Sequence, residues 1–293
     1  MTKIRGTSRL VGLIGWPVEH SLSPAMHNAA FTAQHLDWAY VPLPVLPEDL
    51  ARALDGLKAL NFVGVNVTIP HKQAVMRYLH QISDVAQSIG AVNTIVIKDG
   101  NLYGYNTDRV GFLESLREEE FEPAGKRCII LGAGGAARAV AFALANEGAE
   151  SIFILNRTVE RAEFLVEDLV SHYANVRFAS QKLARETLLP LNDGVDLIVN
   201  TTSLGMQPQV NRSPWPDDLP IPPQATVCDL VYNPVNTRFL QQAAAAGART
   251  IDGVGMLVHQ GATAYRFWTG RAAPVEAMRR AVLDNLTHSI SRD

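Results

Sequence analysis

The chain is poor in cysteine. Its 293 residues include only two, Cys128 and Cys228, which lie far apart and show no metal-type spacing. This pattern excludes a disulfide-rich scaffold and a zinc-finger-like site, and we expect no bound metal. Both cysteines fall in predicted strands, so we interpret them as buried, reduced residues of a cytoplasmic protein.

The sequence also lacks an excess of either charge and any long apolar run. It has 26 Lys and Arg against 29 Asp and Glu, a net charge of −3. We therefore expect neither nucleic acid nor a membrane as a partner, and any anion site must be local. No apolar run reaches the roughly 20 residues that span a bilayer. The apolar stretch 10–16 contains two glycines and has no cleavage site after it, so we expect no signal peptide.

Length and periodicity predict two α/β domains of ordinary size. We expect helices at about residues 24–35, 49–60, 72–79, 84–90, 108–120, 136–144, 239–246, 255–268 and 274–286. We expect strands at about 10–15, 40–45, 62–67, 91–97, 102–105, 128–131, 151–155, 195–199, 226–231 and 250–251.

The residues from Lys126 to Arg138 contain the clearest motif. The predicted strand 128–131 runs directly into Gly132, Gly134 and Gly135, and an alanine-rich helix follows. Strand, glycine turn and helix form the context of a dinucleotide fingerprint, in which the backbone approaches a pyrophosphate and the helix N-terminus binds it. Ala137 takes the place of the third glycine, which the motif permits. The alternative is a tight turn whose small residues serve packing alone.

The next predicted strand, 151–155, ends in Asn156, Arg157 and Thr158, and Arg161 follows one helical turn later. An NAD site usually has an acidic residue here to hold the ribose hydroxyls. A carboxylate would repel a 2′-phosphate, whereas a guanidinium binds it through charge-assisted hydrogen bonds. The sequence therefore favours NADP over NAD, and a solvated surface arginine is the alternative.

Candidate ligand-binding residues in the first half of the chain follow strand ends. Ser21 and Ser23 precede the helix predicted from residue 24, and a hydroxyl there either caps the helix or donates to a small anion. The strand 62–67 must stop at Pro70, so Lys72 emerges just past a strand end, where open α/β sheets bind their ligands. A solvated lysine is the alternative.

Polar residues adjoin three further predicted elements. Asn93 opens a strand, and Thr107 and Asp108 are suited to cap the helix that they begin. The residues 200–206 directly follow a parallel strand, so we expect them to line the cofactor crevice.

Over nearly its whole length the chain resembles the shikimate dehydrogenase family, including its quinate/shikimate branch. The matching segments occur in one order, which makes the resemblance specific. They are Ser21–Pro24, Asn66–Lys72, Gly90–Thr94, Gly104–Asp108, Gly132–Ala136, Asn156–Thr158, Asn200–Thr202, Tyr232–Pro234 and Gly255–Gln260.

The resemblance implies an α/β protein of two domains with a cleft between them. A Rossmann-type NADP-binding domain, residues 111–253, would be inserted into an α/β substrate-binding domain made of residues 1–110 and 254–293. It implies reversible, NADP-linked reduction of 3-dehydroshikimate to shikimate, a step of aromatic amino acid biosynthesis. The partners would be small molecules; the oligomeric state is not readable, and a homodimer is one open arrangement.

The resemblance also implies roles by matching position. Lys72 and Asp108 would be the catalytic pair. The substrate would be bound by Ser21, Ser23, Thr68, Lys72, Asn93, Asp108, Tyr232 and Gln260. The cofactor would be bound by Asp84, Gly132, Ala133, Gly134, Gly135, Ala136, Asn156, Arg157, Thr158, Arg161, Thr201, Leu230 and Gly253.

These residue types suit the implied chemistry. Hydride transfer from an alcohol carbon requires removal of the hydroxyl proton, which a lysine beside a carboxylate can accept as the neutral amine and return as the ammonium. Two alternatives remain open: a dual-specificity quinate/shikimate dehydrogenase that uses NAD or NADP, and a nucleotide-binding regulator without turnover. The presence of both Lys72 and Asp108 argues against the regulator, because a binding protein needs neither.

Overall fold

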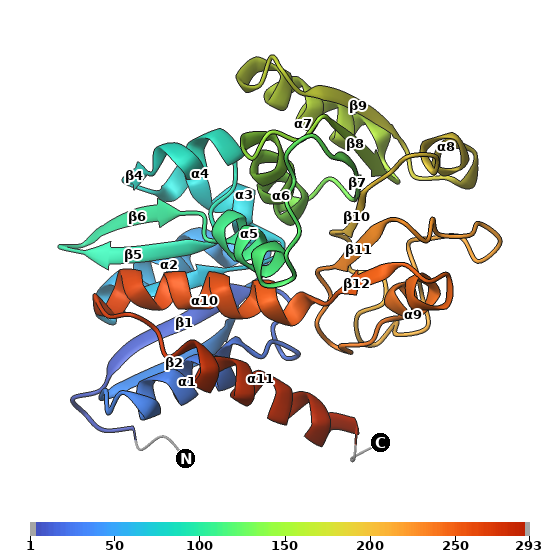
Figure 1. Cartoon of the computed structure of the whole chain (residues 1–293). Coiled ribbons are helices and arrows are strands. Elements are labelled where there is room, and N and C mark those ends of the chain that lie inside the picture. Colours follow the sequence, from blue (N-terminus) through green and yellow to red (C-terminus); the bar gives the residue numbers. More distant parts are fainter. Residues whose placement is uncertain (1–3, 291–293) are drawn as a thin grey trace. The chain divides into compact units, whose positions relative to one another are not determined.

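The structure is a computed structural model that describes residues 4–290 of the chain (Figure 1). Two compact units are present: residues 1–111 with 257–293, and residues 112–256. The divisions fall inside helix α5 (Asp108–Glu118) and helix α10 (Gly253–Thr269). The outermost residues of the predicted substrate domain, 1–3 and 291–293, lie outside the described residues.

The first unit contains a mixed six-stranded sheet with the strand order β2-β1-β3-β5-β6-β4. Strand β1 pairs in parallel with β2 and β3, whereas β5 runs antiparallel to both β3 and β6. The strands are β1 Arg9–Gly15, β2 Trp38–Pro44, β3 Gly64–Val67, β4 Gln81–Ile82, β5 Thr94–Lys98 and β6 Asn101–Tyr105.

Helices cover this sheet with their apolar faces. Leu50, Leu54 and Leu57 of α2 recur at helical spacing and join Val65 and Ile95 of the sheet in one buried cluster. Burying each such side chain stabilises the fold by about 1.5–3 kcal/mol. Helix α1 packs beside α11. The helical elements are α1 Ser23–Ala33, η1 Pro47–Asp49, α2 Leu50–Ala59, α3 His71–Ala74, η2 Val75–Tyr78, α4 Asp84–Ile89 and α11 Val275–Ile290.

The second unit contains a fully parallel six-stranded sheet with the order β12-β11-β10-β7-β8-β9. Counted from β7 as the first strand, this is the 3-2-1-4-5-6 order of a dinucleotide-binding Rossmann fold. The strands are β7 Arg127–Leu131, β8 Ser151–Asn156, β9 Arg177–Lys182, β10 Leu197–Asn200, β11 Thr226–Asp229 and β12 Arg249–Ile251. The remaining helices are α6 Gly135–Asn146, α7 Val159–His172, α8 Arg185–Leu191 and α9 Arg238–Ala245.

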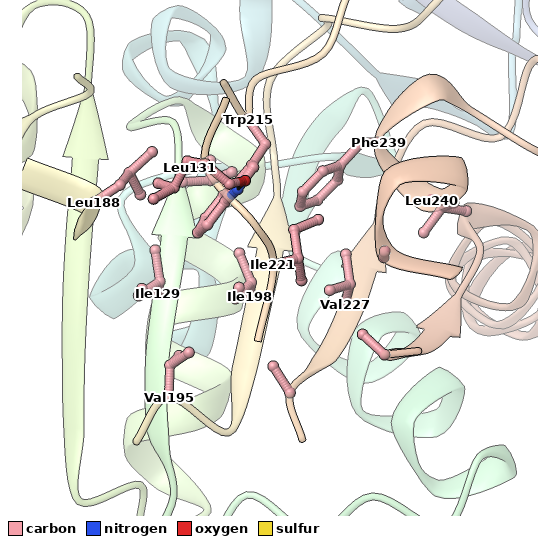
Figure 2. Close-up of a cluster of buried hydrophobic side chains, with 14 of the residues drawn as sticks. Ile129, Leu131, Leu188, Val195, Ile198, Trp215, Ile221, Val227, Phe239 and Leu240 are labelled. Carbon is pink, nitrogen blue, oxygen red and sulfur yellow. Dashed lines mark hydrogen bonds between the residues drawn. The ribbon is translucent and has the colours of Figure 1, made fainter. Parts of the chain in front are cut away.

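One face of the parallel sheet packs against a long loop as well as against helices (Figure 2). Ile129, Ile198 and Val227 project from three strands toward Trp215, which comes from the loop between β10 and β11. Trp215 is only 2% exposed, and its indole nitrogen donates a 2.8 Å hydrogen bond to the carbonyl of Leu219. This anchor holds the proline-rich loop against the sheet.

The structure departs from the predicted elements in several places, and strand β4 and helices α7 and α8 fall outside every predicted range. The helix predicted over residues 72–79 is α3 followed by the 3-10 turn η2, and the strand predicted from residue 91 begins at Thr94. Strand β9 was not predicted, because its residues are mostly polar and lie at the edge of the sheet. Among residues 4–290, no helix is both long enough and apolar enough to span a membrane.

His27 is a buried histidine in the core of the first unit. It is 0% exposed and stacks on Tyr40, with ring centroids 4.5 Å apart and planes at 2°. Within the described residues neither ring nitrogen has a hydrogen-bond partner. Burial therefore disfavours the charged ring and lowers the pKa of His27 to about 3.

His27 should make the fold sensitive to acid. Its pKa in the folded protein lies below the ordinary 6.5, so its contribution to stability is complete above that value and is lost as the pH falls toward 3. At about pH 5 the loss is about 2 kcal/mol. Urea unfolding at about pH 7.5 and about pH 5 should show a smaller acid loss in His27→Phe than in the unmutated protein. Equal losses in the two proteins would contradict this assignment.

Candidate active site

Lys72 and Asp108 form a buried ion pair in the first unit. Lys72 lies in α3, directly after the end of β3, and Asp108 is the first residue of α5. The ammonium Nζ donates to carboxylate Oδ2 at 2.5 Å, and the two side chains are 15% and 6% exposed. A charge-assisted hydrogen bond shielded from water in this way is strong and well oriented. The structure thus brings together the two residues predicted to be catalytic.

The backbone around Lys72 is fixed from both sides. His71 is buried, and its Nε2 donates to the carbonyl of Val45 at 2.7 Å, since a carbonyl can only accept. The His71 amide donates to Thr68, and the amide of Val92 donates to the Lys72 carbonyl. These bonds place the lysine side chain at the carboxyl edge of the sheet.

Asp108 is oriented by asparagine side chains. Asn93 Nδ2 donates to Asp108 Oδ1 at 2.8 Å, while Asn93 Oδ1 accepts from the backbone amide of Thr107 at 2.8 Å, which fixes the orientation of the Asn93 amide group. Asn106 Oδ1 accepts from the amides of Asp108 and Arg109 at 3.1 and 3.3 Å. The side chain that caps α5 is therefore that of Asn106, which directly precedes Thr107 and Asp108, the two residues that the sequence suggested as caps.

A chain of buried hydrogen bonds leads to Asn93 from strands β2, β3 and β5. The Tyr40 hydroxyl donates to Asn66 Oδ1 at 2.9 Å, and Asn66 Nδ2 donates to Thr94 Oγ1 at 3.0 Å. Thr94 in turn donates to Asn93 Oδ1 at 3.1 Å. Each donor in this chain is directed toward Asp108, so the buried polar groups stabilise one orientation of the carboxylate. Sequence reasoning assigned no role to Tyr40, Asn66 or Thr94.

The other predicted substrate residues of the first unit lie at element ends. Leu22 takes the N-cap position of α1 without a side-chain cap, and Ser21 Oγ accepts from the Ser23 amide at 3.3 Å. The Ser23 hydroxyl is therefore not used as a cap. Thr68 follows β3, and Gln260 of α10 donates to the carbonyl of Leu257 at 2.8 Å. No bond among the described residues joins these four side chains to the ion pair.

The glycine turn after β7 has the geometry that a pyrophosphate needs. Gly132 has a φ of +115°, and a Cβ added there would lie 2.5 Å from Thr201 Oγ1. A Cβ added at Gly134 would meet nothing within 4 Å, so this backbone faces open space. Helix α6 begins at Gly135 without a side-chain cap, which leaves its first amides available. These residues, with Ala133 and Ala136, fit the pyrophosphate of a dinucleotide.

Two arginines, Arg157 and Arg161, follow the end of β8. Asn156 Nδ2 donates to the Thr158 carbonyl at 2.8 Å, which shapes the turn. Arg157 and Arg161 are exposed, and neither forms an ion pair with any of residues 4–290. A pair of unpaired guanidinium groups at this position fits a 2′-phosphate.

The remaining predicted cofactor residues lie after β10, β11 and β12. Thr201 donates to the Leu131 carbonyl at 2.8 Å, which ties the end of β10 to β7. A Cβ at Gly253 would lie 2.6 Å from the Leu230 carbonyl oxygen, so only glycine permits this approach. Tyr232 is partly exposed in the same unit. Asp84, by contrast, belongs to the first unit, where it is exposed in the first turn of α4.

Asp229 is a further polar residue of the second unit that sequence reasoning missed. It ends β11, is 0% exposed and lies directly before Leu230. Burial raises the pKa of its carboxyl group to about 6, although three hydrogen bonds oppose the rise. Its place within a run of apolar residues gave no signal in the sequence.

Three family models match successive parts of the chain. The model described as the shikimate dehydrogenase substrate binding domain matches residues 13–95. The model described as shikimate/quinate 5-dehydrogenase matches residues 115–193, and that described as the shikimate 5′-dehydrogenase C-terminal domain matches residues 253–283.

Whole-chain relatives agree with these matches. The shikimate dehydrogenase (NADP(+)) of Moorella thermoacetica is 51% identical in sequence to this chain, over 96% of this chain and 95% of its own length. The chain belongs to the shikimate dehydrogenase family. A relative of the same name from Methanopyrus kandleri is 50% identical over 95% of this chain and 96% of its own. The Thermus thermophilus shikimate 5-dehydrogenase, crystallised with NADP(H) and shikimate, is 38% identical with a TM-score of 0.83, covering 94% and 99% of the two chains.

Two glycine substitutions should separate stability from dinucleotide binding. Gly134→Ala places a methyl group in open space, so the melting temperature should stay unchanged while NADPH affinity falls at least about tenfold. Gly132→Ala forces a strained φ and a contact with Thr201, so it should lower stability by about 1 kcal/mol or more. Thermal unfolding and fluorescence titration with NADPH measure the two effects. Undiminished NADPH binding in Gly134→Ala would place the pyrophosphate elsewhere.

Proposed function

We propose that this protein is an NADP-dependent shikimate dehydrogenase that reversibly reduces 3-dehydroshikimate to shikimate. The observation that carries the proposal is the Lys72–Asp108 pair, which supplies a buried proton donor and acceptor in a chain that also contains a Rossmann unit. The exposed arginines after β8, in place of an acidic residue, support NADP as the cofactor.

Lys72 and Asp108 handle the proton of the reaction. When bound, NADP(H) supplies or accepts the hydride. The Lys72 ammonium gives one hydrogen to Asp108, which leaves others to bond the substrate oxygen and to stabilise negative charge on it. Asp108 keeps the ammonium in place, and Asn93 keeps the carboxylate in place. The pair can therefore protonate a carbonyl oxygen in one direction and accept a hydroxyl proton in the other.

The same proposal assigns recognition of the substrate carboxylate to neutral groups. The hydroxyl of Ser23 is not used as a helix cap, which supports a role for Ser21 and Ser23 in binding the substrate carboxylate. Hydroxyl and amide groups match the hydroxyls of the ring. The proposed substrate residues are Ser21, Ser23, Thr68, Lys72, Asn93, Asp108, Tyr232 and Gln260.

The proposed cofactor contacts divide into three groups. The turn from Gly132 to Ala136 would hold the pyrophosphate, and Arg157 and Arg161 would hold the 2′-phosphate, with Asn156 and Thr158 shaping their turn. Thr201, Leu230 and Gly253 would hold the nicotinamide half. Asp84 completes the proposed set from the first unit.

The proposal also includes the cellular location and the partners of the protein. Cys128 and Cys228 are free and buried, which supports a reducing, cytoplasmic location. The partners of the enzyme are its substrate and its cofactor.

Lys72→Ala tests the catalytic pair. The variant should lose about a hundredfold or more in kcat, the scale of a general acid–base group, while NADPH binding stays within about twofold. Lys58→Ala is the matched control, because Lys58 belongs to the same unit but pairs with Asp55 on the exposed face of α2. Steady-state kinetics with shikimate and NADP, together with NADPH titration, give both readouts. Near-normal turnover in Lys72→Ala would remove this lysine from the mechanism.

Arg157→Ala tests the choice of cofactor. Loss of a charge-assisted phosphate contact should lower kcat/KM for NADP by about tenfold or more and leave that for NAD nearly unchanged. Arg185→Ala is the control, since this arginine pairs with Asp218 in the same unit. An unchanged ratio of the two kcat/KM values in Arg157→Ala would refute the proposed 2′-phosphate site.

A matrix of shikimate and quinate against NADP and NAD tests the activity itself. We expect shikimate with NADP to give the highest kcat/KM. Comparable values for quinate would make the protein a dual-specificity enzyme. NADPH binding without turnover of either substrate would make it a nucleotide-binding regulator.

A further inference from the structure

The carboxylate of Asp229 is buried, and no cation among the residues that the structure describes pairs with it. Its Oδ1 accepts from Asn200 Nδ2 at 2.8 Å and from the Val231 amide at 3.0 Å, and its Oδ2 accepts from Thr237 Oγ1 at 2.7 Å. Asn200, Asp229 and Thr237 are each 0% exposed. All three donors are neutral, so the negative charge is hydrogen-bonded but not cancelled by an opposite one.

This carboxylate holds two strand ends together. Asn200 ends β10, and its Oδ1 accepts from both the amide and the hydroxyl of Thr202, at 2.9 and 2.7 Å. The Leu230 amide donates to the Asn200 carbonyl at 3.0 Å. Asp229 therefore lies beneath the two loops that contain Thr201 and Leu230.

The strand order places these loops on the nicotinamide side of the sheet. In a Rossmann unit the adenosine lies over the second strand, here β8, and the dinucleotide crosses the first strand at the switch point. The nicotinamide half then lies beyond β7, at the carboxyl ends of β10 and β11. Asp229 is the last residue of β11.

The nicotinamide ring changes charge when it is reduced. The oxidised ring is cationic and the reduced ring is neutral, whereas the rest of the cofactor is the same in both forms. A fixed anion near this end of the site therefore attracts the oxidised ring but not the reduced one. The low dielectric of the protein interior strengthens this attraction. Asp252, at the end of β12, has the same sign but is partly exposed and more screened by water.

We propose that the Asp229 carboxylate stabilises bound NADP+ relative to bound NADPH and so sets the ratio of the two affinities. The inference rests on the proposed function, because it requires that the second unit binds this cofactor. If Asp229 only stabilised the loops, its loss would weaken the binding of NADP+ and NADPH equally. If its charge acts on the nicotinamide ring, its loss changes the ratio of the two affinities.

The test is to measure the dissociation constants of NADP+ and NADPH separately, by calorimetry and by fluorescence. Burial raises the pKa of Asp229 to about 6, so at about pH 8 the group is ionised. In Asp229→Asn the ratio Kd(NADP+)/Kd(NADPH) should rise by about fivefold or more, because only the oxidised form loses a favourable charge interaction. A ratio unchanged within about twofold would overturn the proposal and leave Asp229 a structural brace.

Two further variants make the test specific. Asp196→Asn removes a carboxylate from the opposite end of β10, where Asp196 pairs with Lys126 at 3.2 Å, and should leave the ratio unchanged. Thr237→Val removes one hydrogen-bond donor from Asp229 but keeps the carboxylate. Fewer donors then compensate its negative charge. Loss of this hydrogen bond raises the pKa of Asp229 further, so the variant is measured at about pH 9, where the carboxylate is still ionised. There the ratio should fall, opposite in sign to the effect of Asp229→Asn.

The Thr237→Val result keeps the proposal falsifiable if Asp229→Asn does not fold. A ratio that stays constant or rises in Thr237→Val would overturn the proposal, as would a rise in Asp196→Asn as large as that in Asp229→Asn. Failure of the unmutated protein to bind either NADP+ or NADPH would instead refute the proposed function. The two failures are thus distinguishable.

Discussion

The pairing of Lys72 with Asp108 is the interaction on which the proposed chemistry of the first unit depends. A carboxylate with a 6% exposed side chain is costly to bury as an ion unless an opposite charge or hydrogen bonds compensate it. Lys72 supplies the charge, and Asn93 supplies the second hydrogen bond. The buried network of Tyr40, Asn66 and Thr94 then fixes Asn93. Asp229 of the second unit accepts hydrogen bonds from neutral donors, which do not neutralise its negative charge.

Strand direction explains why these residues meet. Lys72 follows the carboxyl end of β3, and Thr94 begins β5. Because β5 runs antiparallel to β3, with Asn66 opposite Thr94, the start of β5 lies at the edge where β3 ends. Asn93 is thereby placed beside the ion pair. In the second unit every strand is parallel, so the polar residues after β8, β10 and β11 share one edge without this reversal.

Some of this could be predicted from the sequence because it depends on local constraints. The glycine turn at residues 132–135 is visible since only small residues allow that backbone path, and the Rossmann strands are continuous apolar runs. The pairing of Lys72 with Asp108 came from the family resemblance, because no periodicity links positions so far apart. Asn66, Thr94 and Asp229 lie inside otherwise apolar strands, where a polar residue gains its role from partners that the sequence does not identify. Strand β9 was missed because edge strands tolerate polar residues.

The nucleotide-binding unit is one continuous stretch, residues 112–256, whereas the first unit is assembled from both ends of the chain. On the ribosome, the parallel sheet is therefore complete and can fold while α10 and α11 are still being synthesised. Helix α1, made near the beginning, must wait for α11 before the face they share is covered. The part of α1 that α11 covers therefore stays uncovered until the last helix of the chain has been made.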